Sequence, residues 1–243
     1  MSQISPFEEN LPKNQANYSP LTPLSFLTRT AEVFPERTAV IHGEIKRNWR
    51  ETLKRCTRLA SALKKNGVVQ GTTVSVMAPN VPELLEAHFG VLMTGGVLNA
   101  LNIRLEAETL AYILEHGQSQ VLITDWEFSP VIKKVLQQLE DPPLVIDIDD
   151  PMAEGGELLG EMDYEAFLKT GDADFEWNLP EDEWQAVSLN YTSGTTGKPK
   201  GVVYQSRGAH LLAIDKILAW GMPRHPVYLW TLPMFHCNGW CFP

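Results

Sequence analysis

Cysteine is scarce in this sequence of 243 residues, which contains only Cys56, Cys237 and Cys241. Three cysteines do not form a framework of paired disulfides. Such a low number of thiols is consistent with a protein of a reducing compartment. A secretory signal is not expected, because the N-terminus lacks a basic stretch followed by an apolar one. The most apolar stretch, residues 84–103, is interrupted by polar residues and glycines, so it predicts a buried helix, turn and strand instead of a membrane span.

Basic residues are also few, since 20 Lys and Arg face 30 Asp and Glu and the net charge is −10. Sixteen of the acidic residues lie in residues 140–183 beside one basic residue, Lys169, which gives this segment a charge of −15 and the rest of the chain +5. The absence of a basic stripe argues against nucleic acid as a partner. We expect the acidic segment to be a solvated connection with one short helix at 163–169. Metal binding and a disordered tail are the less favoured alternatives, because the carboxylates lack a recognisable spacing of metal ligands.

Short apolar runs alternate with amphipathic stretches through most of the chain, which has 44% hydrophobic residues. This alternation predicts an α/β fold with a mostly parallel sheet and helices on both faces. The first twenty residues are polar, rich in Pro and Asn, and predict a loosely held arm before a partial domain at 21–243. Strands are expected at 38–42, 73–77, 97–101, 121–124, 144–148, 186–190, 201–204 and 227–232.

Helices are expected between these strands. Asn48 and Glu51 have the spacing of a capping box ahead of an amphipathic helix on which Cys56 is expected to be a small buried hydrophobe. Asn80 and Pro82 mark the start of the next helix, which Gly95 and the following glycine end. Further helices are predicted at about 24–33, 107–116, 131–139, 163–169 and 207–220.

The most distinctive stretch, residues 191–201, reads Tyr-Thr-Ser-Gly-Thr-Thr-Gly-Lys-Pro-Lys-Gly and lies between two predicted strands. Glycines let backbone N–H groups turn toward one point, hydroxyls donate hydrogen bonds and lysines add charge, so this loop suits a polyanion. A Walker A loop is excluded because Pro199 follows Lys198 and only two residues separate Gly194 from Gly197. A Gly/Ser/Thr-rich surface loop with solvated lysines is the plain alternative.

This stretch resembles the phosphate-binding signature of the adenylate-forming superfamily, which includes acyl-CoA synthetases, luciferases and the adenylation domains of peptide synthetases. Residues 78–105, with Ala-Pro-Asn, Gly-Gly-Val-Leu-Asn-Ala and Asn-Ile-Arg-Leu, extend the likeness, and so do residues 233–240, Pro-Met-Phe-His-Cys-Asn-Gly-Trp. Together with residues 188–197, the last run is most similar to plant acyl-activating enzymes of the short- and medium-chain or benzoate type. The resemblance covers nearly the whole chain and implies the first half of the large N-terminal domain of such an enzyme.

The resemblance implies a two-step ligation that uses ATP, Mg²⁺ and CoA. A short- or medium-chain or aromatic carboxylate attacks the α-phosphate of ATP, and the CoA thiol then displaces AMP from the acyl-adenylate. Stabilising the charge that moves onto the phosphates is the main task of the protein. By position, the residues expected around the β- and γ-phosphates are Thr192, Ser193, Gly194, Thr195, Thr196, Gly197 and Lys200. No catalytic residue is assigned within these residues.

His236 matches a family position that lines the acyl pocket near the adenylate, and Trp240 is expected to narrow that pocket. Without the matched context, a packed core residue is the favoured interpretation of each. A zinc site made by His236 with Cys237 and Cys241 is disfavoured, because adjacent ligands and the lack of a fourth do not suit tetrahedral coordination. Metal ligands are therefore not assigned.

The sequence departs from the family pattern in two ways. Ser206 stands before Arg207, where members of this type commonly have histidine, so no acyl or CoA contact is assigned there. The Tyr-Gly-x-Thr-Glu adenine and magnesium motif, the ribose-binding Asp, the hinge and the C-terminal lid domain with its catalytic Lys have no counterpart in residues 1–243. We therefore expect this chain alone not to complete the reaction.

Two other functions stay open at this point. One is a non-catalytic form that associates or competes with a full-length relative, and the other is a generic nucleotide-binding module. The expected compartment is the cytoplasm or the peroxisome, although the final Cys-Phe-Pro is not a C-terminal peroxisomal tripeptide.

Overall fold

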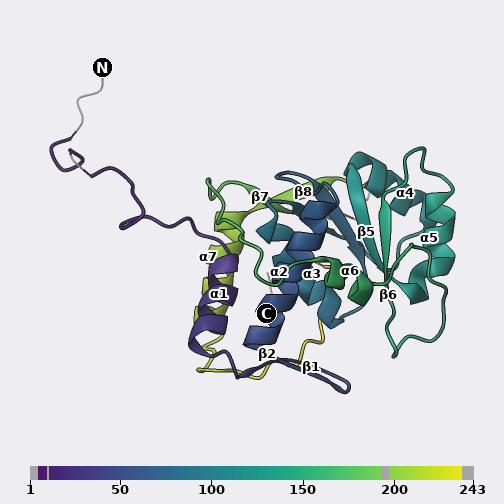
Figure 1. The fold of residues 1–243 in the computed structure, drawn as a ribbon. Coiled ribbons are helices and arrows are strands. Elements are labelled where there is room, and N and C mark those ends of the chain that lie inside the picture. The colour runs from purple at the N-terminus through teal and green to yellow at the C-terminus, as the bar shows by residue number, and fades with distance from the viewer. Residues whose placement is uncertain (1–4, 10, 193–196, 237–243) are drawn as a thin grey trace.

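The computed structural model describes residues 5–9, 11–192 and 197–236, which are organised around a six-stranded sheet (Figure 1). The strands follow the order β6-β5-β3-β4-β7-β8, and all neighbours run parallel except the antiparallel pair β7-β8. Their bounds are β3 Thr73–Met77, β4 Val97–Ala100, β5 Ser119–Asp125, β6 Leu144–Ile148, β7 Ala186–Tyr191 and β8 Gly201–Gln205. The predicted α/β fold with a mostly parallel sheet is confirmed.

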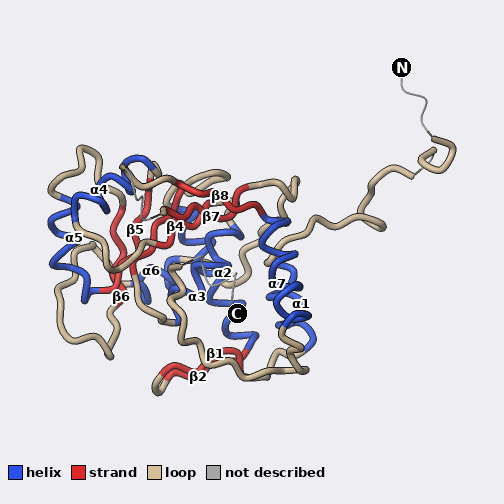
Figure 2. The backbone as a smooth tube through the Cα atoms, turned by 180° about the vertical axis from the view of Figure 1, so that it is seen from behind, coloured by secondary structure: helices blue, strands red, loops and turns tan. Residues whose placement is uncertain are grey.

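Helices cover both faces of this sheet (Figure 2). One face carries α2 (Trp49–Lys65), α3 (Pro82–Met93) and α6 (Tyr164–Thr170), and the other carries α4 (Ala107–His116) and α5 (Ser129–Leu136), which follows the short 3₁₀ helix η1 (Trp126–Phe128). All five residues of β3 are buried, because a central strand in a doubly covered sheet contacts apolar side chains on both sides. Cys56 on α2 is buried as predicted, and burial raises the pKa of its thiol.

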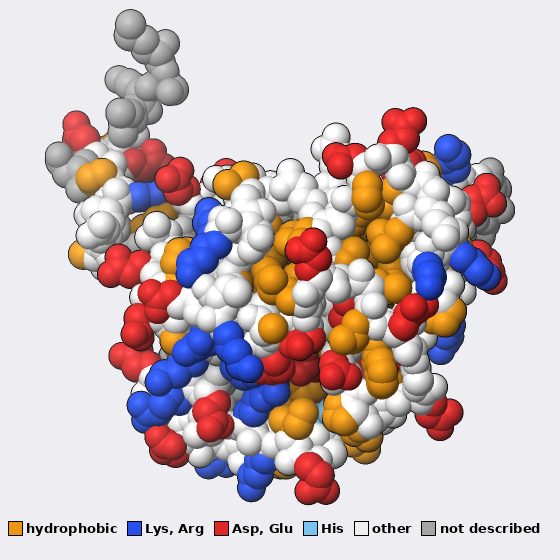
Figure 3. Space-filling view, turned by 45° about the vertical axis from the view of Figure 1, so that its right-hand side comes forward, with side chains coloured by type: hydrophobic (Ala, Val, Ile, Leu, Met, Phe, Trp, Pro, Cys, Tyr) orange, Lys and Arg blue, Asp and Glu red, His pale blue; other side chains and the backbone are white. Residues whose placement is uncertain are grey.

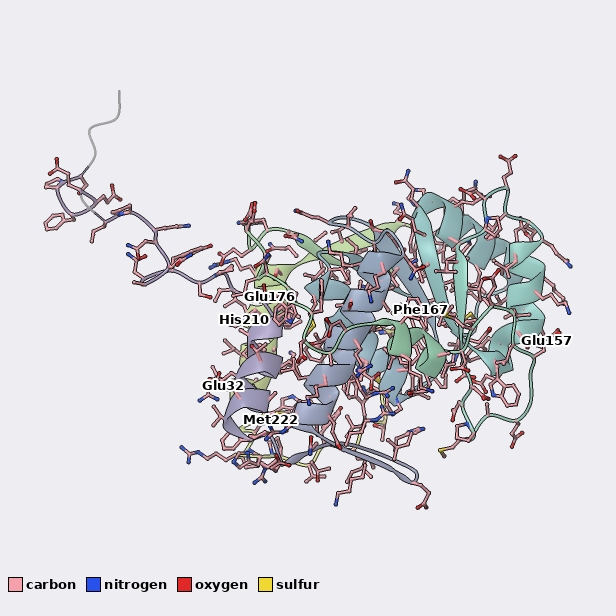
Figure 4. The ribbon with its side chains drawn as sticks, in the orientation of Figure 1. Glu32, Glu157, Phe167, Glu176, His210 and Met222 are labelled. Carbon is pink, nitrogen blue, oxygen red and sulfur yellow. The ribbon has the colours of Figure 1, made fainter. Side chains whose placement is uncertain are left out.

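Two helices lie side by side at the end of the molecule away from β6, α1 (Leu24–Val33) and α7 (Ser206–Ala219) (Figures 1 and 2). Figure 4 shows His210 of α7 beside α1, where its ring stacks on Phe26 with the centroids 4.4 Å apart. The opposite side of α7 faces solvent, and Leu218 is 74% exposed. Residues 11–20 contain neither helix nor strand and extend away from the body. No helix in the described part of the chain is long and apolar enough to cross a membrane.

A two-stranded antiparallel hairpin, β1 (Thr38–His42) and β2 (Ile45–Asn48), precedes α2. The sequence predicted only the first strand, because the second contains Lys46 and Arg47 and lacks an apolar alternation. The predicted capping box is confirmed. Oδ1 of Asn48 accepts a hydrogen bond from the backbone N–H of Glu51 at 2.8 Å, and Oε2 of Glu51 accepts one from the N–H of Asn48 at 2.8 Å.

The acidic segment contains the predicted short helix, and Oδ1 of Asp163 caps it by accepting a hydrogen bond from the N–H of Ala166 at 2.7 Å. One acidic residue of this segment is not solvated. Asp147 is fully buried, and its Oδ2 accepts hydrogen bonds from the backbone N–H groups of Leu159 at 2.9 Å and Gly160 at 2.6 Å. On the face shown in Figure 3, acidic and basic side chains lie next to one another around hydrophobic ones, and Figure 4 shows Glu157 at the outer edge.

The prediction of a strand at residues 227–232 is wrong. These residues form no strand in the structure, although their apolar and aromatic composition is typical of one. Val227 is 97% exposed and Leu229 is 82% exposed. A strand exists only through hydrogen bonds to a neighbour, and this segment pairs with none of the described strands. The composition of the segment favours a strand, but none forms without a neighbouring strand.

Candidate functional site

A cavity of about 390 Å³ lies at the carboxyl ends of β4 and β7. The chain leaves β4 toward α4, and open parallel sheets bind ligands outside the carboxyl ends of their strands. The apolar walls are formed by Ala100, Leu101, Leu105, Ile113, Val202 and Phe235. The remaining lining residues carry polar groups and are Asn99, Asn102, Asn190, Tyr191, Thr192, Tyr204 and His236.

Two asparagines in this lining each have a buried amide oxygen that accepts no hydrogen bond from any described residue. Nδ2 of Asn99 donates to Oγ of Ser75 at 2.9 Å, and Nδ2 of Asn190 donates to Oγ of Ser188 at 3.3 Å, whereas each Oδ1 atom lacks a donor in the described ranges. An unsatisfied buried acceptor costs on the order of 1–3 kcal/mol, so a donor from a ligand or water at this position is stabilising.

These two asparagines were not predicted as site residues, although both lie within the runs that resemble acyl-CoA synthetases. Their signal is the presence of an amide in a strand that is otherwise apolar. Strand interiors seldom contain Asn, because its side chain competes for backbone hydrogen bonds. The third amide in the lining, on Asn102, belongs to the turn that follows β4, where Asn is common.

The predicted acyl-pocket residue His236 lines the cavity. Asn80 holds the segment that carries it, because its Oδ1 accepts a hydrogen bond from the N–H of Met234 at 2.8 Å and its Nδ2 donates to the carbonyl of Leu232 at 2.8 Å. Asn80 was expected to mark the start of α3, but the N-cap of that helix is Val81, and the Asn80 side chain does not cap it. Trp240, Cys237 and Cys241 lie outside the described residues.

Only the ends of the predicted phosphate-binding loop belong to the described residues. Thr192 lines the cavity, and its backbone N–H donates to the carbonyl of Lys200 at 3.0 Å, which closes the base of the loop between β7 and β8. Gly197 and Lys200 are exposed and do not line the cavity. The structure therefore brings Thr192 and His236 to one cavity but does not place Gly197 or Lys200 there. Ser193, Gly194, Thr195 and Thr196 lie outside the described residues.

Ser206, which departs from the family pattern, lies away from this cavity. It is fully buried, and its Oγ donates a hydrogen bond to the carbonyl of Leu21 at 3.1 Å. Its backbone N–H donates to the carbonyl of Gln185 at 3.0 Å. The residue ties the start of α7 to the segment before α1, which is a structural role.

Comparisons with known proteins identify relatives of this chain. The acetate/butyrate–CoA ligase AAE7 of Arabidopsis thaliana, a peroxisomal protein, is 50% identical over 97% of this chain and 43% of its own length. The acetate–CoA ligase CCL3 of Humulus lupulus is 48% identical over 96% of this chain and 43% of its own length. The chain thus spans less than half the length of these curated relatives.

Solved structures share the fold. A long-chain-fatty-acid–CoA ligase, FadD1 of Archaeoglobus fulgidus, superimposes with a TM-score of 0.76 at 21% identity, over 90% of this chain and 43% of that protein. The profile of the AMP-binding enzyme family matches residues 27–243. This match includes every described residue of the cavity lining and both ends of the loop. The chain therefore belongs to the AMP-binding enzyme family.

Proposed function

We propose that this chain forms the phosphate-binding loop and the acyl-binding cavity of an ATP-dependent acid–CoA ligase. The observation that carries the proposal is the lining of one cavity by Thr192, at the start of the predicted loop, and by His236, the predicted acyl-pocket residue. Relatives that are named acetate–CoA and acetate/butyrate–CoA ligases support a short- or medium-chain acid as substrate. An aromatic acid is the further candidate, since a relative from Petunia hybrida is named trans-cinnamate:CoA ligase.

The reaction needs a carboxylate held beside the α-phosphate of ATP. We assign the β- and γ-phosphates to the loop residues Thr192, Ser193, Gly194, Thr195, Thr196, Gly197 and Lys200, because hydroxyls, backbone N–H groups and an ammonium suit a polyanion. The apolar walls, Leu101, Leu105 and Ile113 among them, would hold the acyl chain and exclude water. His236 and Trp240 would border the acyl group. Attack then forms the acyl-phosphate bond and releases pyrophosphate, and the CoA thiol later displaces AMP.

Magnesium accompanies ATP in this proposal, but the described part of the cavity does not fit a magnesium site. Its lining contains no carboxylate, and three asparagine amides are weak substitutes for the Asp and Glu oxygens that Mg²⁺ prefers. Within the described ranges, no group of three or more His, Cys, Asp or Glu side chains is arranged to hold a metal ion. No step is assigned to a metal held by these residues.

The proposal is tested by measuring ATP binding to the 243-residue chain by calorimetry. Lys200→Ala is expected to weaken ATP binding about tenfold, because charge-assisted contacts to phosphate contribute roughly 1.5–3 kcal/mol. Lys46→Ala removes an exposed lysine from the β1–β2 hairpin and is the matched control, with no expected change. Equal ATP affinity in both variants would contradict the proposal. ATP hydrolysis that does not depend on a carboxylic acid would instead favour a generic nucleotide-binding module.

A second candidate function is association with a longer relative, and the surface of α7 favours it. Only Ser206, Ala209 and His210 of this helix are buried, while several of its apolar side chains are solvent-exposed: Leu211, Ile214, Ile217 and Leu218. A helix that is apolar on all sides is normally covered on all sides. Co-purification with the Arabidopsis acetate/butyrate–CoA ligase, lost in Leu218→Glu, would support this function. A monodisperse monomer in the presence of that ligase would contradict it.

The compartment is proposed from the relatives, two of which are named peroxisomal enzymes that use acetate or butyrate. We propose the peroxisome or the cytoplasm. Two fluorescent fusions, one at each end of the chain, are compared with a peroxisomal marker to distinguish the peroxisome from the cytoplasm. Fluorescence that is secreted or bound to a membrane would contradict both compartments.

A further inference from the structure

Both ends of the predicted phosphate-binding loop contact one face of α4. The residues that make these contacts are Tyr112 and His116, which are four positions apart and therefore lie on the same side of the helix. Their rings are 5.2 Å apart at an interplanar angle of 33°. The proposed function does not use either residue, and neither lines the cavity.

His116 contacts the strand that enters the loop. The hydroxyl of Tyr191, the last residue of β7, forms a hydrogen bond of 2.7 Å with Nδ1 of His116. The two rings meet edge to face at 5.7 Å. Burial raises the pKa of the Tyr191 phenol, so the hydroxyl stays protonated and able to donate.

Gly117 permits this close approach. A Cβ atom at this position would lie 2.8 Å from the carbonyl oxygen of Ile113 and 3.3 Å from the Tyr191 hydroxyl. Because the carbonyl belongs to the backbone of α4, it cannot move aside without disturbing the helix end. The chain therefore turns away from α4 at a residue without a side chain, directly beside the Tyr191 hydroxyl.

Tyr112 contacts the segment that leaves the loop. Nζ of Lys198 lies 4.7 Å from the centroid of the Tyr112 ring, within the range of a cation–π interaction. The Tyr112 hydroxyl also donates to the carbonyl of Pro199 at 3.5 Å, a long hydrogen bond. The two ends are joined directly by the bond from the Thr192 N–H to the Lys200 carbonyl. Tyr112 thus fixes the returning segment against the same helix that holds Tyr191.

We propose that Tyr112 and His116 are positioning residues that hold both ends of the phosphate-binding loop against α4. They keep Thr192 and Lys200 in the relative placement that a triphosphate requires. This inference rests on the proposed function, because it assigns the loop to the phosphates of ATP. Its direct consequence is that the two residues act on binding of the β- and γ-phosphates and not on binding of the adenosine or the α-phosphate.

The test compares the affinities of the whole 243-residue chain for ATP and for AMP, which lacks the β- and γ-phosphates. Tyr112→Ala and His116→Ala are expected to weaken ATP binding about five- to thirtyfold, as loss of a cation–π contact and a hydrogen bond predicts. AMP binding is expected to change less than about twofold, because no contact to AMP is assigned to the loop. His116→Gln, which keeps a hydrogen-bonding partner for Tyr191, and Tyr112→Phe, which keeps the ring under Lys198, are expected to recover part of the loss.

Tyr18→Ala is the matched control, because Nζ of Lys13 lies 4.3 Å from the Tyr18 ring in a similar pair within residues 11–20, which extend away from the body (Figure 1). Equal losses for ATP and AMP, or unchanged ATP affinity in both alanine variants, would overturn the positioning role. If an alanine variant does not fold, Tyr112→Phe and His116→Gln are compared with the wild type in its place. A lower ratio of ATP affinity to AMP affinity in these variants supports the positioning role, and an unchanged ratio overturns it. A wild-type chain that does not prefer ATP over AMP would overturn the proposed function first, and the positioning role with it.

Discussion

The carboxylate of Glu86 on α3 accepts a hydrogen bond from the phenol of Tyr164 on α6, with Oε2 and the hydroxyl oxygen 3.0 Å apart. The other oxygen of the same carboxylate accepts from Nη1 of Arg47 at 2.7 Å and from Nε of Arg55 at 2.6 Å. Glu86 is 1% exposed, and Tyr164 is 2% exposed. A single buried carboxylate therefore joins β2, α2, α3 and α6 on one face of the sheet.

Glu86→Ala is expected to destabilise the fold by about 3–5 kcal/mol, because it leaves two largely buried guanidinium groups without their shared partner. Urea denaturation measures the free energy of unfolding. Glu36→Ala is the control, since Glu36 pairs with Arg50 on the surface at 2.6 Å with both side chains more than half exposed. That pair is expected to contribute less than about 1 kcal/mol. Similar losses for both variants would contradict the central role of Glu86.

Gly90 lets α3 pack closely against α2. A Cβ atom at this position would lie 2.7 Å from Cδ2 of Leu59 and 3.0 Å from the carbonyl oxygen of Cys56. Gly90→Ala is therefore expected to cost about 1–3 kcal/mol through overpacking, despite the better helix propensity of alanine. Gly208→Ala in α7, whose Cβ would have no neighbour nearer than 3.9 Å, is expected to stabilise by about 0.5–1 kcal/mol. The midpoint temperatures of thermal denaturation of the two variants should shift in opposite directions. A shift of both midpoints in the same direction would contradict this packing.

Asp125 predicts a pH dependence of stability. Its side chain is fully buried, and Oδ1 accepts the N–H of Glu127 at 3.1 Å, while Oδ2 has no partner among the residues that the structure describes. Burial raises the pKa of this carboxyl to about 7, and the nearby Asp150 and Glu127 carboxylates act in the same direction. Because the folded state binds the proton more tightly than the unfolded one, this contribution to stability is complete below about pH 4. It is lost as the pH rises through 7.

Asp125→Asn is therefore expected to stabilise the protein at pH 8 by about 4 kcal/mol relative to the difference at pH 4, because a pKa raised by about three units is worth about 1.4 kcal/mol per unit. Urea denaturation across this range measures both proteins. The difference between the two curves should grow from about pH 4 to about pH 7 and stay constant above pH 8. Parallel curves would mean that Asp125 has the same pKa in the folded and unfolded states.

The sheet and its helices were predictable because their patterns are local. The capping box at Asn48 and Glu51 and the valine-rich run Thr-Val-Ser-Val-Met at residues 73–77 predict their elements without distant contacts. Residues 227–232 have an equally good strand pattern, but a strand depends on a neighbour that no local pattern supplies. Burial of Asp147 was missed for the same reason, since its partners are backbone N–H groups of residues 159 and 160.

The candidate site was predictable in part. The loop composition and the resemblance led to Thr192 and His236, which the structure brings to one cavity. Asn80, Asn99 and Asn190 were not predicted as site residues, because asparagine is ordinary in turns and only the fold shows what each amide contacts. The contacts of Tyr112 and His116 with the loop were equally hidden, since they join α4 to residues more than seventy positions further along the chain.

The proposed function places the acyl group in the cavity at the carboxyl ends of β4 and β7. Val202 and Val203 are adjacent in β8 and therefore point to opposite faces, and only Val202 lines the cavity. The direct measurement is the affinity of the chain for a butyryl-sulfamoyl adenosine, a stable analogue of the acyl-adenylate. Val202→Phe should weaken binding by about tenfold or more through steric overlap, and Val203→Phe should leave it unchanged. Equal affinities in the two variants would contradict the assignment of this cavity.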